Sequence, residues 1–383
     1  MQSICAIDGV TASGIKEGKF GLALIHAEGA AAVACTQNLA KAAPIILMQE
    51  RMKRGRLCAT ITNSGCANAL TGQRGLADAE EMAAIAAGEL SLDPMEIGVA
   101  STGVISRYLD LPLIRDQCHR IAPLLKNGPD AEIAAAKAIM TTDLVEKHAL
   151  VRREGFTIGG ICKGSGMIAP NMGTMLGYVY TDAEISAPDL QAALKTAVRR
   201  SFNRVVVDGD TSTNDVVFCT ATGNAGKVSL NEFTTALEEC CISLGRQIAM
   251  DGEGATKLIE VVVRGARTED EADLVARTVV GSPLVKTAVY GEDPNWGRIV
   301  AAAGRSGAEF DPEKVSCWIA NKDIRAAVCE QGILSQDLAG AKAALNGREI
   351  RIELDLSAGN EHAVAWGCDL TEKYVEINGK YTT

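Results

Sequence analysis

Apolar positions along the chain follow two spacings, one typical of helices and one typical of buried strands. Apolar residues three and four positions apart predict helices over residues 76–90, 130–140, 188–201, 232–250, 269–280 and 324–332. Short β-branched runs bounded by Gly, Asn or Asp predict strands over residues 21–25, 30–35, 57–62, 98–101, 155–161, 175–181, 205–207, 216–222, 258–264, 315–319 and 350–356. This mixture predicts an α/β or α+β fold.

A change in composition indicates where the chain divides. The 383 residues exceed the length of one typical domain. After Arg264 the sequence GARTEDEAD turns acidic and then enters a predicted helix. We therefore predict a first unit of residues 1–266 and a smaller C-terminal α/β unit of residues 267–383. No period of 20–50 residues repeats, which argues against a solenoid or propeller.

Charge and composition exclude several classes of protein. The 48 acidic and 38 basic residues give a net charge of −10, the wrong sign for a nucleic-acid-binding protein. No uncharged apolar run approaches the length of a membrane span, and the amino-terminal sequence lacks the pattern of a signal peptide, so we expect a cytoplasmic protein. The 4 histidines lack metal-ligand spacing, and the 12 cysteines are scattered without a CxxC pair. We expect reduced, buried cysteines and neither a metal nor another cofactor.

The segment TIGGICKGSGMIAPNMGTMLGYVYTD, residues 157–182, is dense in glycine and contains Lys163 and the dipeptide Gly173-Thr174. One interpretation is a structural turn or a phosphate-binding loop. The other is self-cleavage, in which the Thr174 hydroxyl attacks the carbonyl carbon of Gly173, the acyl group shifts from nitrogen to oxygen, and water hydrolyses the ester. The freed α-amine, whose ordinary pKa is about 7.7–8.0, can then act as the base for the hydroxyl of the same threonine.

Two shorter segments also carry polar groups that fit catalysis or binding. The Thr102 hydroxyl and the Gly103 N–H follow a short apolar strand and could form an oxyanion hole, although STG is also a common turn. Asp208, Asp210 and Asp215 follow another strand. They could bind Mg²⁺ or Ca²⁺, but their spacing lacks the EF-hand pattern, so we favour a hydrogen-bonded structural loop.

Two further segments have simple structural interpretations. In VYGEDPNWGRIV, residues 289–300, Trp296 fits packing, whereas Glu292 could meet the cationic end of a substrate. The terminal YVEINGKYTT contains Asn378 and Thr383, and chain termini are usually frayed.

Taken together, several motifs resemble the ornithine acetyltransferase family, the bifunctional glutamate N-acetyltransferases of arginine biosynthesis. These motifs, in order, are NSGCANA, STG, KGSGMIAPNMGTML, VDGDTSTND, DGEGATK, GEDPNWGR and EINGKYTT. They extend over nearly the whole chain. The resemblance implies a layered αββα sandwich similar to that of the DmpA aminopeptidases, and a chain that cleaves itself.

The resemblance also implies a role for individual residues. Thr174 corresponds to the nucleophile, and cleavage before it would give an α chain of residues 1–173 and a β chain of residues 174–383. Thr102 and Gly103 match the oxyanion hole. The substrate-contacting positions are Thr142 (or its neighbour Thr141), Lys163, Thr174, Glu292, Asn378 and Thr383. Two positions depart from the family pattern, since Gly173 stands where Ala is usual and Cys66 where Asn is more common.

The activity implied by the resemblance is acetyl transfer from N²-acetyl-L-ornithine to L-glutamate through an acetyl-threonine, in a ping-pong sequence. Acetyl-CoA is a possible second donor, and the implied assembly is an (αβ)₂ heterotetramer. One alternative is a self-processing aminopeptidase or amidase, in which water accepts the acyl group. Another is a non-catalytic metal- or nucleotide-binding protein, which would purify as one intact polypeptide.

Overall fold

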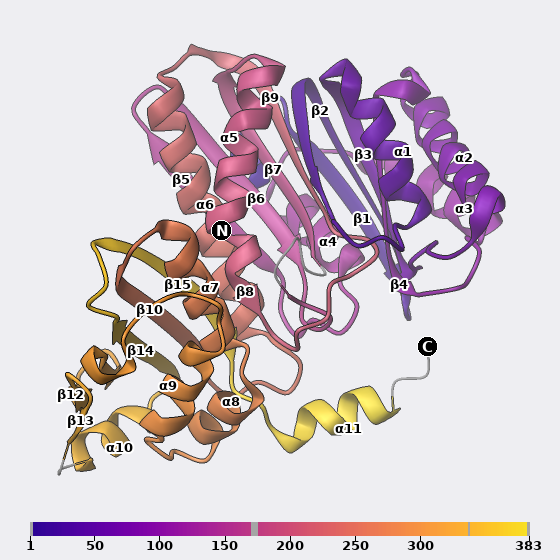
Figure 1. The fold of residues 1–383 in the computed structure, drawn as a ribbon. Coiled ribbons are helices and arrows are strands. Elements are labelled where there is room, and N and C mark those ends of the chain that lie inside the picture. The colour runs from indigo at the N-terminus through magenta and orange to yellow at the C-terminus, as the bar shows by residue number, and fades with distance from the viewer. Residues whose placement is uncertain (1–2, 170–174, 336–337, 381–383) are drawn as a thin grey trace.

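The computed structural model describes residues 3–169, 175–335 and 338–380 and consists of two packed units, each built on one sheet (Figure 1). The larger, eight-stranded sheet has the order β4-β3-β2-β9-β7-β6-β5, with β1 paired to β2. Its strands are β1 (Thr11–Glu17), β2 (Phe20–Cys35), β3 (Arg56–Cys66), β4 (Ile97–Val104), β5 (Lys147–Arg153), β6 (Phe156–Lys163), β7 (Leu176–Glu184) and β9 (Val216–Lys227).

The larger sheet is folded over on itself. In a flat sheet β3 and β7 would lie about 14 Å apart, because β2 and β9 separate them. Instead the Tyr178 hydroxyl on β7 is 2.6 Å from Thr62 Oγ1 on β3. The half that contains β1–β4 therefore faces the half that contains β5, β6, β7 and β9.

Strand β2 connects the two halves. Its first part pairs with β1 and β3, its second part pairs with β9, and its pairing with β3 is interrupted by a bulge between His26 and Gly29. A Cβ at Gly29 would lie 1.9 Å from the Ala221 carbonyl oxygen, so only glycine allows this close approach. The two strands predicted over residues 21–25 and 30–35 are thus one bent strand.

Helices cover both outer faces of the folded sheet (Figure 1). Near β1–β4 lie α1 (Ala43–Arg51), α2 (Gly72–Leu90), α3 (Leu111–Ile121) and α4 (Pro129–Ile139), and over the other half lie α5 (Ala187–Arg200) and α6 (Leu230–Met250). Apolar side chains from the helices and from both half-sheets form two buried cores. The predicted layered αββα sandwich is confirmed.

The second unit has a seven-stranded mixed sheet of order β13-β12-β11-β14-β10-β15-β8. Its strands are β8 (Val205–Val206), β10 (Leu258–Ala266), β11 (Ser316–Ala320), β12 (Arg325–Glu330), β13 (Ile333–Leu334), β14 (Glu349–Asp355) and β15 (Glu361–Cys368). Its helices are α7 (Glu269–Val280), α8 (Pro283–Tyr290), α9 (Trp296–Gly304), α10 (Ala339–Leu345) and α11 (Glu372–Lys380). A division at residue 267 separates β10 from β14 and β15, with which it pairs.

The predicted helix over residues 324–332 is wrong. This segment contains β12, which pairs antiparallel with β11, and the Arg325 guanidinium lies 4.3 Å from the centre of the Trp318 ring. The helix predicted over residues 269–280 is found as α7, which begins where the Thr268 hydroxyl accepts the Glu271 N–H. Trp296, at the start of α9, packs against the core of this unit, as expected.

Glu132 on α4 anchors the amino-terminal segment in the first unit. Its fully buried carboxylate accepts the backbone N–H groups of Ser3 and Cys5 and lies 2.8 Å from His148 Nδ1. Burial raises the pKa of Glu132, but the hydrogen bonds from His148, Ser3 and Cys5 outweigh it and lower the pKa below its ordinary value of 4.5.

This anchor predicts a pH dependence of stability. Because the pKa of Glu132 is lower in the folded than in the unfolded protein, its stabilisation is present above about pH 4.5 and is lost as the pH falls through the folded-state pKa. We expect Glu132→Gln to lower the free energy of unfolding by about 1–3 kcal/mol at pH 7, and by less in acid. Urea unfolding of the wild type and the variant, at pH 7 and at a pH below the folded-state pKa of Glu132, measures the two losses of stability. Equal losses at the two pH values would contradict it.

Candidate active site

A cavity of about 160 Å³ lies where the carboxyl ends of β4 and β6 meet the carboxyl-terminal helix α11. Its lining includes five of the residues predicted for the site, Thr102, Gly103, Thr142, Lys163 and Asn378. The predicted nucleophile Thr174, its neighbour Gly173 and the terminal Thr383 lie outside the described residues.

The predicted oxyanion-hole pair lies near the end of strand β4. Gly103 has a φ of +127°, and a Cβ there would lie 2.4 Å from the Gly65 carbonyl carbon on β3. Glycine is therefore required, because β3 runs directly against this position. Thr102 is buried on the cavity wall, with its Oγ1 at 3.5 Å from Lys163 Nζ.

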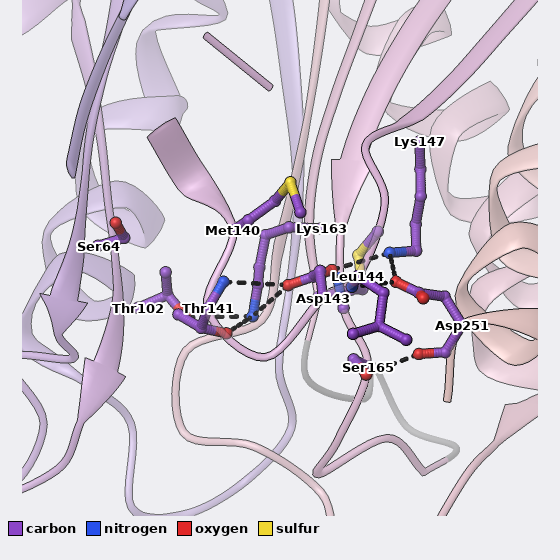
Figure 2. Close-up of polar contacts among 12 residues, drawn as sticks. Ser64, Thr102, Met140, Thr141, Asp143, Leu144, Lys147, Lys163, Ser165 and Asp251 are labelled. Carbon is purple, nitrogen blue, oxygen red and sulfur yellow. Dashed lines mark hydrogen bonds and ion pairs between the residues drawn. The ribbon is translucent and has the colours of Figure 1, made fainter. Parts of the chain in front are cut away.

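Lys163, the last residue of β6, is the cation of the cavity. Its side chain is 3% exposed, and its Nζ donates to Thr141 Oγ1 at 2.8 Å (Figure 2). Thr141 and Thr142 both line the cavity, and the hydroxyl that contacts Lys163 belongs to Thr141. A second lysine, Lys16, donates to the Met140 carbonyl at 2.6 Å. Burial and the positive charge of Lys163 lower the pKa of Lys16 to about 8.

Behind Lys163 lies Asp143, which is shared by two lysines (Figure 2). Asp143 Oδ2 is 3.8 Å from Lys163 Nζ, and Asp143 Oδ1 accepts Lys147 Nζ at 2.9 Å. Burial raises the pKa of Asp143, but the charges of Lys163 and Lys147 outweigh burial and hold this pKa well below its ordinary value. Lys147 also donates to Asp251 Oδ2 at 2.6 Å.

Among the described residues, the carboxylate that lines the cavity belongs to Glu253. Glu253 accepts a hydrogen bond of 2.8 Å from Asn378 Nδ2 on α11. Glu292 does not line this cavity, and its Oε1 accepts Lys257 Nζ at 2.9 Å. Glu253 belongs to the motif DGEGATK, so the signal was present in the sequence, but nothing there distinguished it from other acidic residues. The lining residues Ser212, Thr213 and Asn214 were also not singled out.

Two carboxylates, of the half-buried Asp208 and the fully buried Asp215, hold the described chain on either side of residues 170–174. Asp208 accepts the N–H groups of Met167 and Ile168 at 2.6 and 2.9 Å, and Asp215 accepts the Met175 N–H at 2.9 Å. Burial raises the pKa of Asp215 well above its ordinary value. Within the described part of the chain, no three His, Cys, Asp or Glu residues are grouped so that they could hold a metal ion. Asp208 and Asp215 accept backbone N–H groups, which is compatible with a hydrogen-bonded loop.

The cysteines and the apolar character of the helices bear on two further predictions. Each of the twelve cysteines is buried with a free thiol, which confirms that part of the prediction. Among the described residues, no helix combines the length and the apolar character that crossing a membrane requires.

Comparison with known proteins identifies the family. Residues 8–383 match the ArgJ family. The chain is 50% identical to the glutamate N-acetyltransferase of Methanosarcina mazei, covering 99% of this chain and 98% of that protein. It is 48% identical to the arginine biosynthesis bifunctional protein ArgJ of Symbiobacterium thermophilum, covering 92% and 90%. A crystal structure of the ArgJ protein of Bacillus halodurans matches with 45% identity and a TM-score of 0.49, covering 52% of this chain and 96% of that one. The match over nearly the whole chain shows that this protein belongs to the ArgJ family.

Proposed function

We propose that the protein is a glutamate N-acetyltransferase that moves an acetyl group from N²-acetyl-L-ornithine to L-glutamate in arginine biosynthesis. The observation that supports this proposal is one cavity whose described lining includes Thr102, Gly103, Lys163 and Glu253. The names of the relatives, glutamate N-acetyltransferase and bifunctional ArgJ, support the same activity.

The first half-reaction forms an acetyl-enzyme. Self-cleavage between Gly173 and Thr174 frees the α-amine of Thr174, which removes the proton of its own hydroxyl. The hydroxyl oxygen attacks the acetyl carbonyl carbon of acetylornithine. The Thr102 hydroxyl and the Gly103 N–H donate to the resulting oxyanion, and the α-amine of ornithine leaves with the proton. In the second half-reaction the α-amine of glutamate attacks the acetyl-threonine and takes the acetyl group, which restores the free hydroxyl.

Two charged side chains in the cavity account for substrate binding. Both amino acids carry an α-carboxylate, which the ammonium of Lys163 can bind in either half-reaction. Their side chains differ, because ornithine ends in an ammonium and glutamate in a carboxylate. Glu253 supplies the negative charge that suits the ornithine ammonium, and Asn378 orients Glu253.

The remaining parts of the proposal concern assembly and donors. The α and β chains remain together in a cytoplasmic (αβ)₂ heterotetramer, and no cofactor takes part. Acetyl transfer from acetylornithine is the main activity, with acetyl-CoA as a second possible donor.

Purified protein and labelled substrate provide the test. Intact-mass measurement should find two fragments that meet at Gly173 and Thr174. The enzyme should then form labelled N-acetylglutamate from acetyl-labelled acetylornithine only when glutamate is present. Labelled acetate as the main product would instead favour an amidase, and one intact polypeptide without transfer would overturn the proposal.

The role of Glu253 can be tested with Glu292 as the matched control. We expect Glu253→Gln to raise KM for acetylornithine by about 10- to 100-fold, because the variant loses a charge-assisted contact to the substrate ammonium. KM for glutamate should change far less. Glu292→Gln should leave both KM values within about threefold, because Glu292 contacts Lys257 and does not line the cavity. Steady-state kinetics of both variants decide between the two residues, and the opposite ranking would restore Glu292 to the site.

A further inference from the structure

A buried chain of four charged residues continues from the cavity into the interior. We call Lys163, Asp143, Lys147 and Asp251 the buried charge chain (Figure 2). Their side chains are 3, 0, 0 and 5% exposed, and their charges alternate in sign. Removing four charges from water is costly, and an alternating arrangement is what makes it tolerable. The proposed reaction uses only Lys163, so the other three require an explanation.

Among the residues that the structure describes, Lys163 has fewer hydrogen-bond acceptors than it has donors. An ammonium group has three N–H donors. Thr141 Oγ1 accepts one at 2.8 Å, and Thr102 Oγ1 lies at the limit of hydrogen bonding, 3.5 Å away. Asp143 Oδ2, at 3.8 Å, neutralises part of the charge without taking a donor. Lys163 is therefore held beside the cavity with a donor still available to a ligand.

Other contacts hold the Asp143 carboxylate at this distance. Its Oδ1 accepts the Gly164 N–H at 2.6 Å and Lys147 Nζ at 2.9 Å, and its Oδ2 accepts the Thr141 N–H at 3.1 Å. Lys147 is fixed in turn by Asp251 at 2.6 Å. Without Lys147, the cation of the buried charge chain that remains beside Asp143 is Lys163, whose Nζ is 3.8 Å from Asp143 Oδ2.

We propose that Lys147 and Asp251 are positioning residues that hold the Asp143 carboxylate back from Lys163, so that the Lys163 ammonium remains available to the α-carboxylate of the substrate. This inference rests on the proposed function, in which Lys163 binds that carboxylate. It predicts that removing Lys147 weakens recognition of the carboxylate although Lys147 lines no part of the cavity.

The experiment compares N²-acetyl-L-ornithine with its carboxamide, N²-acetyl-L-ornithinamide, which has nearly the same shape but no carboxylate. The ratio of kcat/KM values for acid over amide measures carboxylate recognition. A change that merely loosens the fold lowers both values and leaves the ratio unchanged. We expect a wild-type ratio of about 10- to 100-fold, typical of one charge-assisted hydrogen bond, and a ratio near one in Lys163→Met.

The informative variant is Lys147→Met combined with Asp251→Asn, which removes one charge of each sign and leaves Lys163 paired with Asp143. We expect its acid-over-amide ratio to fall about tenfold below that of the wild type, while the amide remains a substrate. Lys147→Arg, which keeps the cation, should retain the ratio within about threefold. If the double variant does not fold, Asp143→Glu is the second test, because the extra methylene brings the carboxylate onto Lys163 and should also lower the ratio.

The outcomes distinguish a failure of the positioning role from a failure of the proposed function on which it rests. A ratio that falls in Lys163→Met but stays at the wild-type value in the double variant, or in Asp143→Glu, overturns the positioning role and leaves the proposed function intact. A ratio that does not fall in Lys163→Met overturns the assignment of the substrate carboxylate to Lys163, and the positioning role with it.

Discussion

Replacing Thr174 by alanine is expected to leave one uncleaved polypeptide that transfers no acetyl group. The hydroxyl oxygen of Thr174 both starts the cleavage of the preceding peptide bond and carries the acetyl group, so its removal eliminates both reactions. We expect acetyl transfer to fall by about 10⁴-fold or more, as when a catalytic nucleophile is removed from a hydrolase. Denaturing gel electrophoresis with intact-mass measurement follows cleavage, and labelled acetylornithine follows transfer.

Thr174→Ser is the matched control for this experiment, since serine keeps the hydroxyl and loses only a methyl group. It should still cleave before residue 174 and should retain measurable transfer. Cleavage at this bond in Thr174→Ala, or transfer at the wild-type rate, would remove the basis of the proposed mechanism.

Replacing Thr102 by valine is expected to lower kcat by about 10²- to 10³-fold, the usual effect of removing one oxyanion-hole donor. Valine has nearly the same shape as threonine, and Thr102 is buried on the cavity wall, so KM should change little. Rates should be expressed per cleaved enzyme, because the same donors can assist self-cleavage.

Thr102→Ser tests whether the hydroxyl is the group that matters at this position. It should recover kcat to within about tenfold of the wild-type value. If Thr102→Val instead raised KM at unchanged kcat, Thr102 would be a ground-state contact to substrate and not an oxyanion donor.

The fold was predictable where one segment determines its own structure. The helix over residues 269–280 has a capping threonine and an acidic first turn, and it is found within those bounds as α7. The segment over residues 324–332 contains Ala and Arg, which favour a helix in isolation. It forms β12 because β11 offers an edge and the Trp318 ring stacks on Arg325. Such tertiary contacts cannot be predicted from the local sequence.

The site residues that could be predicted from the sequence are those that belong to recognisable motifs. The resemblance supplied Thr102, Gly103, Lys163 and Asn378, which all line one cavity. It also implied Glu292, which pairs with Lys257 Nζ and does not line this cavity, so a substrate contact at Glu292 stays a prediction. Likewise, Lys147 and Asp251 are 104 residues apart, and only the folded chain brings them together.

Helix α11 places Asn378 in the lining of the cavity without contributing to the core. None of its residues is buried, yet its Asn378 contacts Glu253. The Thr371 hydroxyl, which bonds to the Gly254 carbonyl at 2.7 Å, attaches the chain just before this helix. A fusion tag joined to the carboxyl end is therefore expected to change the turnover of the enzyme while leaving its melting temperature unchanged.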